Sequence, residues 1–219
     1  MKNYKKNLEI LKKNHVYSEE MEHDACGVGL IASTEGKKSR KVVEYGIEAL
    51  KAVWHRGAVD ADGKTGDGAG IHVEIPKDFF IEKIEVTGHT HDNSEICVGM
   101  IFLPRNDYAA QESCKTIVES ELTKNDFSIY GWRQVPVNPK VLGEKAFQTM
   151  PEIIQVLFKS NNPELLNKDL ERKIYETRRI IENKAFKISL NNFYICSLSS
   201  KSMIYKGMFL AEAISDFFL

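Results

Sequence analysis

Cys26 is the residue of this sequence with the clearest capacity for chemistry. It lies in the run HDACGVG, residues 23–29, between a charged segment and a glycine-flanked apolar stretch. If the chain begins at Cys26 after removal of the preceding residues, a thiol and a free α-amino group belong to one residue. A thiol is mostly protonated near pH 7, and an α-amino group with a pKa of about 7.7–8.0 is a base that accepts its proton without a histidine. The pattern indicates a nucleophile; the competing interpretation is a small buried core residue, as most cysteines are.

The residues before Cys26 form a separate, highly charged segment. They carry lysines first and glutamates later, and they contain no apolar region of the kind that a secretory signal requires. One interpretation is a solvated N-terminus. The other is a short leader, residues 1–25, whose removal exposes Cys26 as the first residue of the mature chain.

A glycine-rich run, TGDGAG at residues 65–70, is the second feature of chemical interest. A phosphate-binding loop needs a strand before it and a helix after it, so that the helix N-terminus meets the anion. Here an expected helix precedes the run and a β-like segment follows it, which argues against nucleotide binding. The glycines instead indicate a backbone that passes close to a ligand or to the strand that carries Cys26.

The elements that must position these residues come in mixed runs. We expect a buried strand at 27–33 and a helix at 40–54, ended by Gly57 in a left-handed cap, with a loop at 60–70. Further strands are expected at 71–75, 96–103, 127–137, 153–158, 193–198 and 202–205, the last two as a pair, and helices at 108–123 and 164–183. Strict βαβ alternation is missing, which favours an α+β layered fold over a doubly wound parallel sheet.

Composition narrows the class of protein. The 219 residues are 42% hydrophobic and 28% charged with a net charge of −1, which fits a soluble globular chain and gives no sign of general nucleic-acid or membrane binding. The four cysteines lie far apart, so neither a zinc ribbon nor a disulfide scaffold is indicated, and free thiols fit a reducing cytoplasm. The histidines show no ligand spacing on one helix, so we expect no metal site.

Several motifs in register carry a resemblance to a known family. They are HDACGVG (23–29), HRGA (55–58), TGDGAGI (65–71), GWRQVPV (131–137), VLGEKA (141–146) and YKGM (205–208). In this order they resemble the start of the glutamate synthase large subunit, whose N-terminal domain is a type-II glutamine amidotransferase. The resemblance runs from about His23 to Met208.

The resemblance implies a fold and a reaction. The fold is the N-terminal-nucleophile (Ntn) hydrolase type, a four-layer αββα sandwich, with residues 1–25 as leader and 26–219 as a partial amidotransferase domain. Cys26 attacks the side-chain amide of L-glutamine, and ammonia leaves behind a γ-glutamyl thioester that water hydrolyses. Arg56 then lies beside the nucleophile and shapes the site, and the loop with Gly66, Asp67 and Gly68 packs closely against it.

The resemblance also implies cofactors and partners outside this chain. In the complete enzyme the ammonia passes to a domain with FMN and an iron–sulfur cluster and is added to 2-oxoglutarate in glutamate biosynthesis. The chain itself is expected to carry no cofactor. Its partners are L-glutamine, the rest of the large subunit, and a small subunit or another electron donor, in the cytoplasm.

The sequence departs from the family pattern at its end. In the family, the arginine that holds the glutamine α-carboxylate and the Asn-Gly pair of the oxyanion hole follow shortly after the position of Leu219. Loss of one oxyanion donor typically costs about 10²–10³ in rate. We therefore expect a sandwich that is incomplete at the C-terminus and an isolated chain that is inactive.

Two other interpretations stay open at this point. One is a different Ntn-type amidohydrolase that acts on another amide. The other is a non-catalytic fragment of a split gene, suggested by the apolar end Phe217-Phe218-Leu219, because an edge cut from a larger core tends to associate.

Overall fold

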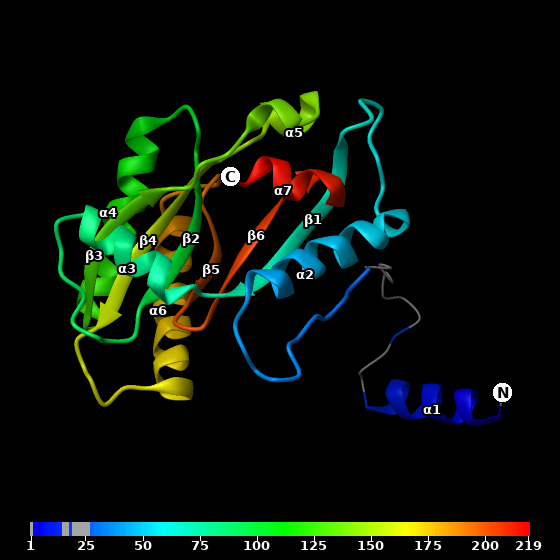
Figure 1. Ribbon diagram of the computed structural model, residues 1–219, viewed down its shortest axis with the longest axis horizontal. Coiled ribbons are helices and arrows are strands. Elements are labelled where there is room, and N and C mark those ends of the chain that lie inside the picture. Colours follow the sequence, from blue (N-terminus) through cyan, green and yellow to red (C-terminus); the bar gives the residue numbers. More distant parts are fainter. Residues whose placement is uncertain (1, 15–17, 19–26) are drawn as a thin grey trace.

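The computed structural model describes residues 2–14, 18 and 27–219, so Cys26 lies outside the described residues (Figure 1). The helices are α1 (Lys2–Lys13), α2 (Arg40–Ala52), α3 (Lys77–Val86), α4 (Tyr108–Lys124), α5 (Glu144–Gln148), α6 (Asn167–Lys187) and α7 (Ile214–Phe217). The strands are β1 (Thr65–Glu74), β2 (Cys97–Leu103), β3 (Phe127–Gln134), β4 (Glu152–Ser160), β5 (Tyr194–Ser199) and β6 (Ser202–Phe209). Short 3₁₀ turns are η1 (Trp54–Arg56), η2 (Pro139–Val141) and η3 (Ala211–Ala213).

The strands form two antiparallel sheets. One has four strands in the order β3-β4-β2-β5, and the other pairs β1 with β6. A mixed α/β fold without parallel strand pairs among the described residues agrees with the expected α+β class. The absence of βαβ alternation in the sequence therefore correctly predicted that the fold is not a doubly wound parallel sheet.

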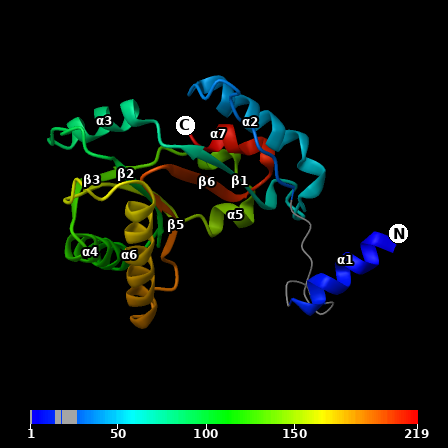
Figure 2. The same ribbon diagram turned by 90° about the horizontal axis from the view of Figure 1, so that it is seen from below.

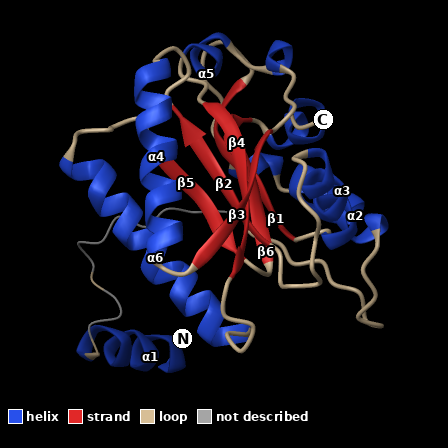
Figure 3. Cartoon of the chain, turned by 90° about the vertical axis from the view of Figure 1, so that its left-hand side faces the viewer, coloured by secondary structure: helices blue, strands red, loops and turns tan. Residues whose placement is uncertain are grey.

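One face of the four-stranded sheet is covered by α4 and α6, which lie together on one side of the strands (Figure 3). Ile101 of β2 and Val118 of α4 belong to the core between them. Helix α6 contributes a buried stripe at helical spacing, as expected from an amphipathic pattern. Its buried residues are Leu170, Ile174, Thr177, Ile181 and Ala185.

The opposite face of this sheet packs against the β1–β6 pair. Alternate residues of a strand point to opposite faces, so Met100 of β2 turns away from α4 and α6 and joins a core with Phe209 of β6. Helix α2 borders this core through Ile47, close to Ile71 of β1. Figure 2 shows α2 and α3 on the side of the strands opposite to α4 and α6.

The expected strand at 27–33 is wrong. These residues form no strand in the structure, and Val28 and Leu30 are 88% and 89% exposed. An alternating apolar pattern becomes a strand only when a neighbouring strand and a covering layer are available, and here the segment has neither.

Two other local expectations need correction. The loop expected at 60–70 is shorter, because β1 already begins at Thr65 and includes the glycine-rich run. Gly57 has φ −93° and is not a left-handed cap, since the chain continues from α2 through η1 instead of reversing there.

The expected pair of strands at 193–198 and 202–205 is also wrong, because β5 and β6 belong to different sheets. The turn between them is held by Glu171 of α6, which accepts hydrogen bonds from the hydroxyls of Ser199 (2.9 Å) and Ser200 (2.8 Å) and from the Ser200 backbone N–H (2.7 Å). A side chain from a distant helix therefore redirects the chain from one sheet to the other.

Helix α3 was missed by sequence reasoning. Its buried residues, Phe80 and Ile84, are four positions apart and follow Pro76 at the N-cap. A single pair at this spacing after a proline is the signal that could have predicted it.

The packing of α6 predicts the effect of a core truncation. Ile174→Ala is expected to lower the free energy of unfolding by about 2–5 kcal/mol, because Ile174 is fully buried between α6 and the sheet. The neighbouring change Tyr175→Ala, at a side chain 60% exposed, should cost much less. Urea denaturation of both variants measures the difference, and equal losses would contradict this packing.

Candidate functional site

The structure brings three of the expected site residues to the start of β1. Gly66 forms an isolated antiparallel bridge with Val59, and the N–H of Asp67 donates to the carbonyl of Ala58 at 3.2 Å. The first residues of β1 therefore lie beside the segment that follows Arg56, whose backbone belongs to η1.

Asp67 faces the same segment with its side chain. A Cβ atom placed on Gly57 would stand 3.2 Å from Asp67 Oδ1. The carboxylate thus approaches the turn directly after Arg56, and Gly57 leaves room for it. The structure brings Asp67 and the backbone of this turn together; Cys26 is outside the described residues.

The glycines of β1 pass close to β6. A Cβ on Gly66 would meet the carbonyl carbon and oxygen of Phe209 at 2.8 Å, and one on Gly70 would meet the Cβ of Lys206 at 2.8 Å. Gly68 has φ +133°, a conformation that side chains rarely adopt, and it lies in a register shift of the β1–β6 pair. Among the described residues, the close neighbour that explains these glycines is β6.

A carboxylate holds the turn before β1. Asp62 Oδ1 accepts the backbone N–H groups of Lys64 (2.9 Å) and Thr65 (2.7 Å), and Oδ2 accepts the Thr65 hydroxyl at 2.6 Å. The Thr65 hydroxyl, followed by the backbone N–H groups of Thr65 and Lys64, holds the pKa of Asp62 far below its usual value. Sequence reasoning missed Asp62 and Thr65, although Asp followed by Thr three residues later is typical of such turns.

The VLGEKA motif packs on this turn. Lys145 Nζ donates to Asp60 Oδ2 at 2.6 Å, and the backbone N–H of Ala146 donates to the Thr65 hydroxyl oxygen at 3.3 Å. The hydrogen bond from Lys145 lowers the pKa of Asp60 and raises that of Lys145. Gly143 lies so close that a Cβ there would stand 2.6 Å from the Thr65 nitrogen.

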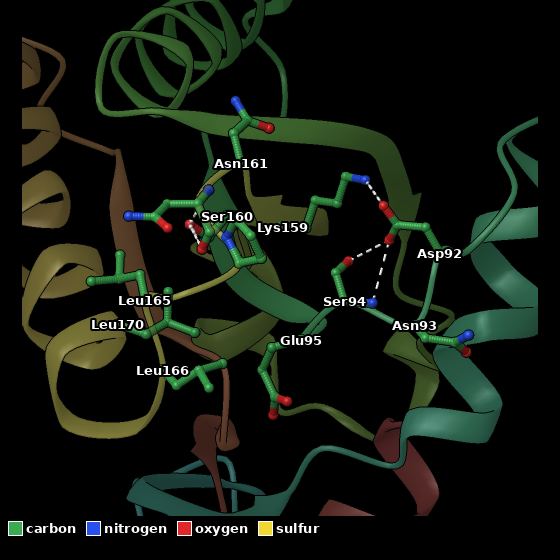
Figure 4. A pocket seen from close by; sticks show the side chains of 12 residues that line it. Asp92, Asn93, Ser94, Glu95, Lys159, Ser160, Asn161, Leu165, Leu166 and Leu170 are labelled. Carbon is green, nitrogen blue, oxygen red and sulfur yellow. Dashed lines mark hydrogen bonds and ion pairs between the residues drawn. The ribbon is translucent and has the colours of Figure 1, made fainter.

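A hollow of about 490 Å³ lies elsewhere, lined by residues before β2, at the end of β4, in the loop that follows it and in α6 (Figure 4). Asp92 forms an ion pair with Lys159 there. The hydrogen bond that Lys159 donates in this pair, followed by the hydrogen bond from the Ser94 side chain, holds the pKa of Asp92 well below its usual value. Gly66, Asp67 and Gly68 do not line it. The hollow is therefore separate from these three expected site residues.

The three cysteines that the structure describes are unlike a reactive thiol. Cys97, Cys114 and Cys196 are free and buried. Burial raises the pKa of all three thiols, to about 11 for Cys114 and Cys196. Within residues 2–14, 18 and 27–219 no three His, Cys, Asp or Glu side chains cluster as metal ligands, and no helix there is long and apolar enough to cross a bilayer.

The comparisons define the class of protein. The family model of class-II glutamine amidotransferases matches residues 26–219, and the chain belongs to this family. It is similar in particular to glutamate synthases. The large chain of NADPH glutamate synthase from Azospirillum brasilense is 53% identical over 215 residues, which are 98% of this chain and 14% of that protein.

Two further relatives agree. Ferredoxin-dependent glutamate synthase 1 from Arabidopsis thaliana is 40% identical, and ferredoxin-dependent glutamate synthase 2 from Synechocystis sp. is 36% identical. Each match covers 200 residues, 90% of this chain and 12% of the relative. The chain therefore corresponds to the glutamine amidotransferase part of glutamate synthase and spans about an eighth of the length of these relatives, which confirms the resemblance seen in the motifs.

The close approach of β1 and β6 predicts that Gly66 tolerates no side chain. Gly66→Ala should lower the free energy of unfolding by about 1–3 kcal/mol, because the new methyl group meets backbone atoms that cannot move aside. In Gly46→Ala the nearest atom is the flexible end of Ile71 at 3.3 Å and alanine favours the helix, so no loss is expected. Chemical denaturation of the two variants checks this contrast.

The Asp62 contacts predict a pH dependence. The folded protein holds the pKa of Asp62 below its unfolded value, so the carboxylate stabilises the fold above a pH of about 4, and this stabilisation is lost as the pH falls further. The difference in unfolding free energy between the parent and Asp62→Asn should be constant from pH 7 to 5 and should shrink below pH 4. A difference at pH 2 as large as that at pH 7 would show that the carboxylate charge is not involved.

Proposed function

We propose that this chain supplies the nucleophile of a glutaminase, in which Cys26, freed of residues 1–25, attacks the side-chain amide of L-glutamine. The isolated chain is proposed to turn over no glutamine, because the oxyanion hole and the carboxylate-binding arginine of the family are expected outside it. The observation that carries the proposal is the start of the class-II amidotransferase match at Cys26. The residue types at this point suit the chemistry, since a terminal cysteine supplies both the nucleophile and its base.

The proposed reaction needs only Cys26 and one water molecule for its proton transfers. The α-amino group of Cys26 takes the thiol proton as Sγ attacks the amide carbon, and a tetrahedral oxyanion forms. The C–N bond then breaks, the same amino group gives its proton to the leaving nitrogen, and ammonia departs from a γ-glutamyl thioester. Water attacks the thioester, its proton passes through the amino group to Sγ, and L-glutamate leaves.

Arg56, Gly66, Asp67 and Gly68 are proposed to shape the site around Cys26. Support comes from the contacts at the start of β1, where Asp67 approaches the turn that follows Arg56. A carboxylate beside this turn offers an acceptor for an ammonium group of the substrate. The glycines have no side chain and so allow the close approach of β1 and β6.

For the fold we propose the four-layer αββα arrangement of Ntn hydrolases. It is supported by α4 and α6 on one face of the four-stranded sheet, by the shared core between this sheet and β1–β6, and by α2 beside β1. We further propose residues 1–25 as a leader and 26–219 as the domain. The exposed apolar segment at 27–33, which forms no strand, is available to pair with one once Cys26 is the first residue.

In a complete glutamate synthase the ammonia is proposed to react with 2-oxoglutarate in another domain. The relatives are named for NADPH or ferredoxin, which suggests a small subunit or ferredoxin as electron donor. The described cysteines do not fit an iron–sulfur cluster, because they are buried, lie on separate elements and have raised thiol pKa values. The cluster is therefore proposed to belong to another part of such an enzyme, and the family resemblance implies the same for FMN.

The proposal predicts a difference between two forms of the chain. A chain beginning at Cys26 should be alkylated at Cys26 by the diazo-ketone analogue of glutamine about 10²-fold faster than the chain beginning at Met1, because only in the first does Cys26 itself carry a free α-amino group. Mass spectrometry locates the adduct and gives the rates.

The controls separate the rival interpretations. Cys26→Ala should lose the adduct. In a complete glutamate synthase that contains this chain, excess L-glutamine should protect Cys26 whereas asparagine and simple amides should not. Protection by another amide would indicate a different amidohydrolase. Equal alkylation rates of the two forms, or an adduct on another residue, would contradict Cys26 as the nucleophile.

A further inference from the structure

We propose that Thr65 is a positioning residue of the glutaminase site, held in place by Asp62 and by the VLGEKA segment at residues 141–146. The inference rests on the proposed function, because it concerns the same site. It assigns a role to the VLGEKA motif, which contains none of the expected site residues.

The Thr65 hydroxyl is fully engaged on both sides. It donates to Asp62 Oδ2 at 2.6 Å and accepts the Ala146 N–H at 3.3 Å, and the residue is only 2% exposed. One donor and one acceptor of fixed direction leave the side chain a single orientation. The hydroxyl thus joins the turn before β1 to α5.

Gly143 brings the VLGEKA segment into contact with this hydroxyl. A Cβ there would stand 2.6 Å from the Thr65 nitrogen and still closer to Asp62 Oδ2 and to the Thr65 hydroxyl. The two chain segments therefore meet at backbone distance. The Lys145–Asp60 ion pair adds a second link, but its side chains are 65% and 35% exposed, so it contributes little stability by itself.

From Thr65 the connection to the site is short. The Thr65 carbonyl accepts the Asp60 N–H at 2.9 Å, and Gly66 bridges to Val59. The next residue is Asp67, whose N–H bonds to Ala58 beside the turn that follows Arg56. A displacement of Thr65 therefore moves Asp67 relative to this turn. Displacements of about 1 Å at such positions are enough to cost 10²-fold in rate.

The test reads the electrostatic surroundings of Cys26 without requiring turnover. The chain beginning at Cys26 is alkylated with iodoacetamide between pH 5 and 10, and the rate at Cys26 is followed by mass spectrometry. The pH profile gives the pKa of the thiol, which depends on the charges placed around it. The buried cysteines Cys97, Cys114 and Cys196 have raised pKa values and should react far more slowly.

Thr65→Val removes the hydroxyl at nearly constant volume and is expected to shift the midpoint of the Cys26 profile by about half a pH unit or more. Thr65→Ser restores the hydroxyl and should return the parent profile. Gly143→Ala, which forces the contact apart from the other side, should shift the midpoint as Thr65→Val does. Thr177→Val removes an equally buried hydroxyl bonded to the Lys173 carbonyl in α6, and it should leave the profile unchanged.

The outcomes distinguish the two proposals. If Thr65→Val shifts the profile and Thr65→Ser does not, Thr65 positions the site. If Thr65→Val and the parent share one profile, or if Thr177→Val shifts it equally, the positioning role is wrong while the proposed function stands. If the parent profile equals that of a short peptide beginning CGVGLI, no site forms around Cys26, and both proposals fall.

Discussion

The structure depends on the close approach of two backbones, β1 and β6. Where Gly66 and Gly70 face β6, there is no space for even one additional carbon atom. This contact pairs β1 with β6 and lets the two-stranded sheet share a core with the four-stranded sheet. It also fixes the start of β1, where Asp67 approaches the turn after Arg56. The β1–β6 pairing and the position of Asp67 beside this turn therefore rest on the same glycines.

The four-stranded sheet supplies the rigid support behind this contact. Its central strands are buried on both faces, with α4 and α6 on one side and β1–β6 on the other. Within this apolar layer Gln155 of β4 is fully buried, and its side chain meets Arg133 of β3 (2.8 Å) and the sulfur of Met203 of β6 (3.9 Å). A buried polar group that needs specific partners disfavours other registers between the two sheets.

The sequence predicted those elements whose pattern is local. Helices α2, α4 and α6 follow from apolar residues at a period of 3.6, and strands β2 and β4 follow from short apolar runs; their ends differ by a few residues. Two of the errors concern partners distant in sequence. The segment 27–33 has strand composition without a partner strand, and Glu171 of α6 separates β5 from β6. No local pattern encodes such contacts.

The residues of the candidate site also fall into a group that the sequence indicates and a group that only the structure shows. Cys26, Arg56 and the glycine-rich run were recognised because their residue types and order resemble a family. Asp62 and Thr65 show a local turn pattern, but their contacts with Gly143 and Ala146, far along the chain, have no such pattern. Spacing within one segment predicts reactive groups, whereas the side chains that hold them are found only when the chain is folded.

The pairing of β1 with β6 also sets an order of events during synthesis. The first strand of the described chain has the last one as its partner, and every strand of the other sheet is made in between. Long-range pairing of this kind is slow, and it has to wait until Phe209 has left the ribosome. In a nascent chain the glycine-rich strand β1 is therefore an unpaired edge while the four-stranded sheet and its helices α4 and α6 assemble. During that interval an exposed strand edge can aggregate, and a chaperone that covers it would prevent this.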